Sequence, residues 1–271
     1  MRLSSWHLPL DHLSASSLAD AITCPERWRR ERILGEWGKQ NLDGFIGSVH
    51  HRAVEWVLRR KQDGLETNTL AELEPLYMHC WWDQTSQEGE PEWTEKPEKV
   101  QDKGKGMLLS AVGGIVPQVE PTGVEAWFEE RVPGVPVPIQ GRIDTTTTEA
   151  IWEFKTTKQK QSKPKSKWRF QGRIYQLVER KPVHWGITTK QATPVSYSPA
   201  HADTPGLVLP LVNPDVTVTM ILNAIAYLDD LYVRYGPGET WPMTGIMGDW
   251  YCDYCPFGPK NPNPSCPAWR E

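Results

Sequence analysis

Three of the five cysteines of this 271-residue chain lie within its last 20 residues, and a fourth lies near the N-terminus. Cys252 and Cys255 form a C-x2-C step, which lets two thiolates reach one metal centre, and Cys266 follows after ten residues rich in Pro, Gly and Asn. A tetrahedral zinc site or a cubane iron–sulfur cluster needs a fourth ligand, for which Cys24 is a candidate. Such a centre would join the two ends of the chain, which favours one domain over two.

The fifth cysteine, Cys80, is the alternative fourth ligand. It lies in the apolar run Met78-His79-Cys80-Trp81-Trp82, which is typical of an ordinary buried thiol, so we expect Cys24 to complete the site. An odd number of cysteines argues against a disulfide framework. The residues alone leave zinc and an iron–sulfur cluster both open.

Composition narrows the class of protein. With 38% hydrophobic and 24% charged residues, the chain is typical of a globular protein and not of a disordered or fibrous one. We expect no membrane-spanning segment, because no run approaches about 18 consecutive apolar residues. Met1 to Asp11 lack the apolar core of a secretory signal, so we expect a cytoplasmic protein, or one of a host cytoplasm if it is phage-encoded. The net charge of −4 excludes a uniformly basic DNA-coating protein but not a local basic channel.

Hydrophobic periodicity changes along the chain from helical to strand-like. Helical patterns cover residues 18–34, 43–61, 69–82, 98–112, 166–180 and 214–235; strand patterns cover 124–131, 135–144, 151–155, 183–189 and 193–198; residues 200–213 are loop-like. This order predicts one α/β domain of residues 1–271 around a mixed central sheet flanked by helices. Within it we expect a helical N-terminal part and insertion (1–120), an α/β core (121–200) and a C-terminal helix with a Cys-rich tail (214–271).

Two neighbouring strands carry the most informative polar residues. Asp144 ends the segment Gly141-Arg142-Ile143-Asp144, and Glu153-Phe154-Lys155 follows after eight residues. A short connection places Asp144 beside Glu153, and Glu153 and Lys155 share a face because they are two residues apart. Two carboxylates and a lysine suit a Mg²⁺ or Mn²⁺ site that cleaves phosphodiesters, whereas an exposed strand end with a salt bridge is the simpler alternative.

Two helical patterns carry further candidates. In the first, His51 and Glu55 lie four residues apart on one face, and Gly47 one turn earlier permits close approach of another backbone. In the helix after the third strand, Gln171 and Tyr175 are also four residues apart and share a face that suits contact with a nucleic-acid backbone.

A basic segment runs from Lys155 to Arg173 and contains no acidic residue. Its eight cations are Lys155, Lys158, Lys160, Lys163, Lys165, Lys167, Arg169 and Arg173. Trp168 and Phe170 are interleaved with them, which is typical of a phosphate track with stacking platforms for single-stranded bases; a solvated loop is the alternative.

Together these motifs resemble a known family. The order GxxxH, GRID, ExK and QxxxY resembles the RecB-type branch of the PD-(D/E)XK nucleases. With one N-terminal and three C-terminal cysteines, the chain is similar to the iron–sulfur subgroup, which includes the AddB nuclease domain and CRISPR-associated RecB-like exonucleases, some of them phage-encoded. The resemblance extends from Cys24 to Cys266, and it implies a restriction-endonuclease-like core with a helical insertion and a Cys-rich closure.

The resemblance also implies roles for individual residues. His51, Asp144 and Glu153, with the Phe154 carbonyl, would bind the metal, and Lys155 would be the catalytic lysine. Gln171 and Tyr175 would contact DNA, and Glu125 resembles an acidic position near the metal. The four cysteines Cys24, Cys252, Cys255 and Cys266 would hold a 4Fe–4S cluster, although the gap from Cys255 to Cys266 is long for the subgroup and keeps zinc as an alternative.

From residues and resemblance together we expect a metal-dependent DNA exonuclease acting on single strands or duplex ends, in recombination, repair or DNA processing. Its partners would be DNA and recombination, CRISPR or phage replication proteins, with no membrane. The contrasting hypothesis is a non-catalytic iron–sulfur or zinc protein that binds DNA or acts as an adaptor. No G-x-x-x-x-G-K-[ST] motif is present in the sequence, so we expect no ATP-driven motor. Residues 62–120 match no motif and would form a helical cap.

Overall fold

The computed structural model describes residues 6–38, 40–65, 69–190, 202–203 and 207–243, together with Cys255, Phe257 and Cys266. Its helices are α1 (Ala15–Ala21), α2 (Pro25–Arg32), α3 (Leu42–Gln62), α4 (Leu70–Glu88), α5 (Pro97–Gly114), α6 (Ser166–Glu179) and α7 (Pro214–Tyr235), with a 3₁₀ turn at Val116–Gln118. Its strands are β1 (Leu13–Ser14), β2 (Gly123–Glu130), β3 (Ile139–Thr146), β4 (Ile151–Thr157), β5 (Val183–Thr189), β6 (Ala202–Asp203) and β7 (Val208–Leu209).

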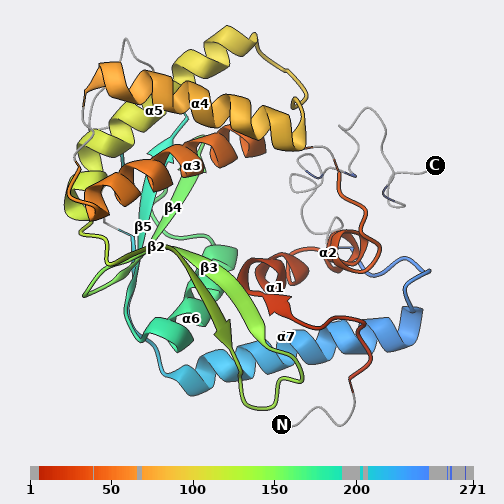
Figure 1. Cartoon of the computed structure of the whole chain (residues 1–271). Coiled ribbons are helices and arrows are strands. Elements are labelled where there is room, and N and C mark those ends of the chain that lie inside the picture. Colours follow the sequence, from red (N-terminus) through yellow and green to blue (C-terminus); the bar gives the residue numbers. More distant parts are fainter. Residues whose placement is uncertain are drawn as a thin grey trace.

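The strands form one mixed sheet with helices on both sides (Figure 1), which confirms the predicted fold class. The strand order is β1-β3-β4-β5-β6, with β2 paired to β3 and β7 paired to β5. One buried cluster joins the sheet to α1, α6 and α7 and includes Ile143 and Trp185. A second joins it to α3, α4 and α5 and includes Trp152 and Phe154. The described part of the insertion at 62–120 is therefore packed on the sheet as helices.

The β2–β3 hairpin contains a kink at Glu125. The antiparallel register runs from Gly123↔Thr146 and Val124↔Thr145 directly to Ala126↔Ile143. Glu125 has a φ of 52°, in the left-handed region that non-glycine residues rarely adopt. Before the kink Val124 packs in the α3–α5 cluster, and after it Phe128 packs in the α1–α6–α7 cluster. The hairpin therefore passes from one core to the other at Glu125, which is opposite Asp144.

Strand β4 is paired very differently on its two edges. Along β5 it forms a parallel ladder over its whole length, from Ile151↔Val183 to Thr157↔Thr189. Along β3 it pairs only at Thr145↔Trp152 and Thr146↔Ile151. Beyond these pairs the two strands separate, and the Phe154 N–H donates to Asp144 Oδ2 at 2.8 Å instead of to a strand carbonyl. We call the opening between β3 and β4 beyond this point the fork.

The predicted helices and strands largely match, with two corrections. The single helix expected over 18–34 is in fact two helices. Cys24 has an extended backbone (φ −152°), and Pro25, which has no N–H to donate to a preceding turn, starts the new helix α2. The loop expected over 200–213 includes the short strands β6 and β7, which gain ladder hydrogen bonds by pairing with β5. The strand predicted at 193–198 lies outside the described residues.

Helix α7 is long and apolar enough, by length and composition, to cross a membrane. A core helix has the same composition, and Ile221, Ile225 and Leu228 of α7 are buried in the cluster with α1 and α6. These three residues therefore have packing partners inside the protein.

Candidate functional site

The fork brings together side chains from two strands and a helix. Asp144 comes from β3, Glu153 and Lys155 from β4, and His51 from α3. His51 Nδ1 lies 3.7 Å from Asp144 Oδ2, and Lys155 Nζ donates to Glu153 Oε2 at 2.8 Å. These four residues were grouped from the sequence, and the structure places all of them around one opening.

Glu125 completes the group from the kink in β2. Its Oε1 lies 2.8 Å from His51 Nε2. One ligand atom each of His51, Glu125 and Asp144 lies within 4.8 Å of the others, a spacing that suits a metal ion. A left-handed glutamate costs free energy, so its presence at this point is a sign of a functional constraint.

Glu153 is the most buried acidic group of the fork, with a side chain only 1% exposed. Burial raises its pKa from 4.5 to about 7, and the nearby Asp144 charge adds to the effect against the opposing influence of Lys155. Among the described residues its Oε1 has no hydrogen-bond partner. A buried carboxylate oxygen without a donor fits the position of a metal ligand.

The other charges of the fork respond to these carboxylates. The Asp144 charge raises the pKa of His51 from 6.5 to about 9, since it outweighs the burial that disfavours the imidazolium, and the hydrogen bond to Glu125 adds to the rise. Burial alone would lower the pKa of Lys155, but Glu153 and Asp144 outweigh it and raise the pKa above its usual value. Without a metal, the carboxylates of the fork are therefore paired with the imidazolium of His51 and the ammonium of Lys155.

The backbone of Phe154 and the small size of Gly47 also agree with the roles predicted for them. The N–H of Phe154 faces Asp144. Because the N–H and C=O of one residue point to the same side of an extended strand, the Phe154 carbonyl also faces the fork. A Cβ on Gly47 would lie 3.2 Å from Thr156 Oγ1, so glycine lets α3 approach β4 closely and brings His51 to the carboxylates.

The fork opens into a groove of about 1630 Å³ between α3 and the segment after β4. Its lining includes eleven basic side chains: Arg27, Arg52, Arg142, Lys155, Lys158, Lys160, Lys163, Lys165, Lys167, Arg169 and Lys190. Four acidic residues line it: Asp43, Glu55, Glu88 and Glu125. The mildly acidic chain thus has a strongly basic groove beside its carboxylates.

The predicted DNA track lies only partly in this groove. Lys163, Lys165, Lys167 and Arg169 line it, although Lys167 also lies 3.6 Å from Asp20. Arg173 does not: its guanidinium contacts the sulfur of Met220 on α7. Trp168 also lines the groove, but its ring is only 6% exposed and packs in the core with Ile174, so its stacking on a base stays a prediction.

Gln171 and Tyr175 are bonded to each other and to β3. Gln171 Nε2 donates to the Tyr175 hydroxyl at 2.7 Å, and this hydroxyl donates to the Arg142 carbonyl at 3.1 Å. Tyr175 is buried. In this structure the pair holds β3 in place beside the fork, and a contact of either residue with DNA stays a prediction.

The described cysteines of the predicted cluster lie near one another. The Cys255 thiol interacts electrostatically with Cys24 and Cys266, and burial raises its pKa to about 11. Cys24 is the N-cap of α2, and the Cys266 thiol lies 3.3 Å from Met243 Sδ. Cys252 lies outside the described residues. Cys80 is buried among Leu76, Tyr77 and other apolar residues of the α3–α5 cluster, as an ordinary thiol would be.

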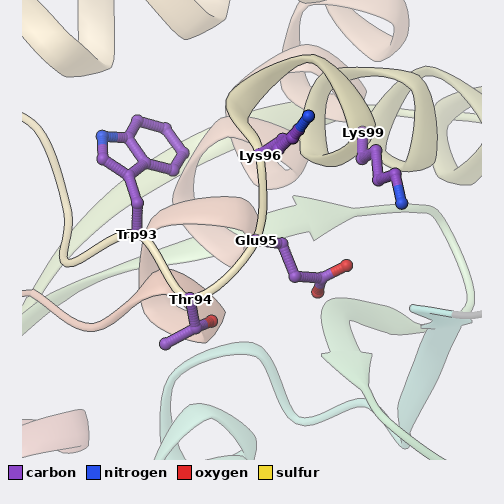
Figure 2. A pocket seen from close by; sticks show the side chains of 5 residues that line it. All are labelled: Trp93, Thr94, Glu95, Lys96 and Lys99. Atoms are coloured by element: carbon purple, nitrogen blue, oxygen red, sulfur yellow. The ribbon is translucent and has the colours of Figure 1, made fainter.

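A second, smaller hollow of about 490 Å³ lies at the start of α5 and is lined by Trp93, Thr94, Glu95, Lys96 and Lys99 (Figure 2). Its only acidic residue, Glu95, is paired with Lys103 at 2.9 Å. The fork therefore has the better set of reactive groups.

Arg142 and Trp127 lie beside the fork without a role predicted from the sequence. They are directly opposite in the β2–β3 register, and both are exposed. Strand alternation could have identified them, because residues two apart on a strand share a face: Trp127 is two residues from Glu125, and Arg142 is two residues from Asp144.

The comparison with protein families agrees with this geometry. Residues 12–259 match the family described as the PD-(D/E)XK nuclease superfamily. A solved structure described as "Crystal structure of SSO0001" has 16% sequence identity and a TM-score of 0.42, over 94% of this chain and 87% of that one. No curated protein matches. Because the family match covers most of the sequence and includes every group of the fork, the chain belongs to the PD-(D/E)XK nuclease superfamily.

Proposed function

We propose that this protein is a Mg²⁺- or Mn²⁺-dependent exonuclease that degrades single-stranded DNA or duplex ends. The observation that carries the proposal is Glu153, a buried carboxylate with an unpartnered oxygen, next to Asp144 and bonded to Lys155. Membership of a nuclease superfamily supports phosphodiester hydrolysis. The choice of exonuclease rests on the resemblance of the ordered motifs and cysteines to RecB-like enzymes.

The residues that would hold the metal are Asp144, Glu153, Glu125 and His51, with the Phe154 carbonyl. Oxygen-rich donors with one imidazole suit Mn²⁺ and Mg²⁺. The bound ion would supply Lewis-acid stabilisation of the charge that builds on the phosphate. Loading would require His51 to lose its proton, whereas Lys155 could keep its bond to Glu153 Oε2, because Oε1 is the oxygen without a partner.

Lys155 has a separate task. Its raised pKa keeps it an ammonium at neutral pH, so it is a poor proton acceptor. We assign it the orientation of the attacking water and the stabilisation of the phosphate oxygens. Its position two residues from Glu153 on the same strand keeps it beside the reacting atoms.

The basic groove supports a nucleic-acid substrate. Lys163, Lys165 and Arg169 lie on the segment that follows β4 and line the groove that the fork enters. Cations in such a groove bind phosphates without regard to sequence, at the cost of strong salt dependence. This favours a processing nuclease over one that recognises a specific site.

We propose that Cys24, Cys255 and Cys266, with Cys252, hold a 4Fe–4S cluster that joins α2 to the C-terminal tail. The proximity of the three described thiols supports a shared centre. Four thiolates also suit zinc. Iron and sulfide analysis with the absorption spectrum distinguishes the two: a brown protein with equal iron and sulfide supports the cluster, and a colourless zinc protein contradicts it.

The activity is tested by digestion of end-labelled linear and of circular single-stranded DNA with Mg²⁺ or Mn²⁺. We expect the linear strand to be shortened from an end and the circle to survive. Cleavage of the circle would identify an endonuclease instead. DNA binding without cleavage of either substrate would favour the adaptor hypothesis.

A further inference from the structure

The β2–β3 hairpin continues past the fork with one exposed face. Beyond the kink, Phe128 and Ile143 face the α1–α6–α7 core. Trp127 and Arg142 alternate with them on the opposite face and are directly paired in the register. The Trp127 side chain is 61% exposed, whereas Trp28, Trp152 and Trp185 are buried. A large indole is thus left in solvent beside the fork.

We propose that Trp127 and Arg142 form a nucleotide subsite next to the metal site: Arg142 binds a phosphate adjacent to the scissile one, and Trp127 stacks on an unpaired base. This inference rests on the proposed nuclease function and specifies its substrate as a single strand or a frayed end. It assigns both residues to substrate binding and neither to the chemical step.

The spacing fits one nucleotide. Trp127 follows Glu125 by two residues, and Arg142 precedes Asp144 by two, each step being about 7 Å along a strand. This is comparable with the length of one nucleotide in an extended single strand. A strand with its scissile phosphate at the fork would therefore place the next phosphate near Arg142.

Arg142 has an exposed side chain on an anchored stretch of backbone. It lines the basic groove together with His51 and Glu125. Within the described part of the chain it forms no ion pair, in contrast to Lys158, which pairs with Asp43 at 2.9 Å. Its backbone carbonyl accepts the hydrogen bond from Tyr175, so α6 holds this residue of β3 in place. The backbone of Arg142 is thus anchored, and its guanidinium, which lines the groove, suits bidentate binding of a phosphate.

Trp127 adds selectivity for unpaired bases. Stacking of a base on an aromatic side chain contributes about 1–3 kcal/mol and tolerates any base, because every base has a π face. In a duplex the base faces are covered by neighbouring bases. An indole beside the metal site therefore favours a single strand over an intact duplex.

The first experiment measures binding without cleavage. In an Asp144→Asn background, fluorescence anisotropy gives the Kd for a labelled single strand and for the same sequence as a duplex. We expect Trp127→Ala to weaken single-strand binding about 5- to 150-fold and to change duplex binding little. Trp127→Phe keeps a stacking face and should recover most of the loss. Trp82→Ala is the matched control, since this indole is also 61% exposed but lies on α4.

The second experiment locates the base. Oligonucleotides lacking one base at successive positions are bound to the Asp144→Asn protein with and without Trp127→Ala. If the indole stacks, one missing base weakens binding to the parent and has no effect on the Trp127→Ala protein. Arg142→Gln should reduce the slope of log Kd against log salt concentration by about one, the change expected for the loss of one phosphate contact.

Equal losses on single and double strands, or no loss in Trp127→Ala and Trp127→Phe, would overturn the subsite. This result is separable from failure of the proposed function. If the unmodified protein digests DNA but Trp127→Ala digests it equally well, only the subsite is wrong. If the unmodified protein digests no DNA, the nuclease proposal itself fails.

Discussion

The two edges of β4 differ in pairing: the fully paired edge along β5 contributes to stability, and the edge that separates from β3 holds the candidate reactive groups. Along β5 every residue from Ile151 to Thr157 is in a parallel ladder, and apolar side chains cover both faces. Along β3 the ladder stops after two pairs, and the space beyond contains carboxylates, a lysine and a histidine. The closed edge satisfies its backbone polar groups within the ladder, whereas the open edge holds a buried Glu153 oxygen without a partner among the described residues.

This contrast has a physical basis. A continuous β3–β4 ladder would leave no room for an ion or a phosphate between the strands. Separating them costs backbone hydrogen bonds, and this cost is offset in part where the Phe154 N–H finds the Asp144 carboxylate. The left-handed Glu125 adds a further cost on the same side. The left-handed Glu125 and the unpartnered Glu153 oxygen thus both lie where a ligand is expected.

We expect the largest loss of activity when a carboxylate of the open edge is removed. Asp144→Ala removes a carboxylate that the metal would need, and we expect nuclease activity to fall by at least about 100-fold with the fold retained. Glu149→Gln is the control, because Glu149 is exposed in the turn that closes the other end of the β3–β4 pair. Initial rates on labelled DNA and circular dichroism test this. Full activity of Asp144→Ala would mean that the fork is not the active site.

On the closed edge, a substitution should affect stability. A Cβ on Gly186 would lie 2.8 Å from the Phe154 ring and 2.9 Å from Ile115 Cγ2. We expect Gly186→Ala to lower the free energy of unfolding by about 1–3 kcal/mol through overpacking. Urea denaturation measures it, with Gly238→Ala as the control because no atom lies near its Cβ position. Equal stability of the two variants would show that the closed edge is loosely packed.

The pH dependence of stability should reveal the titration of Glu153. A carboxyl with its pKa raised from 4.5 to about 7 contributes stability that is fully present below pH 4.5 and lost as the pH rises through about 7. In the metal-free protein, Glu153→Gln should therefore flatten the fall of Tm between pH 5 and 8. Thermal unfolding with a chelator measures this effect of a few degrees. Parallel curves for the two proteins would place the titration elsewhere.

The smallest effect is the release of about one proton from His51. This imidazole is protonated below a pKa of about 9, so it must deprotonate to bind a metal at pH 7. Its ion pairs stabilise the metal-free fold below pH 6.5 and lose this contribution as the pH rises through about 9. Calorimetry of Mn²⁺ binding in buffers of different ionisation enthalpy counts the protons. His51→Gln should release about one proton fewer, and an unchanged count would exclude His51 as a ligand.

Much of the fold was predictable because local patterns and packing agree. The predicted helix 43–61 corresponds to α3 (Leu42–Gln62), and 214–235 matches α7 (Pro214–Tyr235). The burial of Trp168 was not predictable in this way: it belongs to the basic segment, yet it lies in the first turn of α6, seven residues before Tyr175 on the buried face. Charges nearby in sequence gave no information on which face of that helix is covered.

The sequence by itself determined the chemical groups of the fork, since the spacing of Asp144, Glu153 and Lys155 fixes strand position and face. Only the tertiary structure decided that β3 and β4 separate there, that a left-handed Glu125 joins them and that Trp127 is left exposed beside Arg142. These features depend on long-range packing: the hairpin changes from one core to the other at Glu125, and α3 approaches β4 through Gly47. Local residue patterns do not record contacts between segments that are distant in the chain.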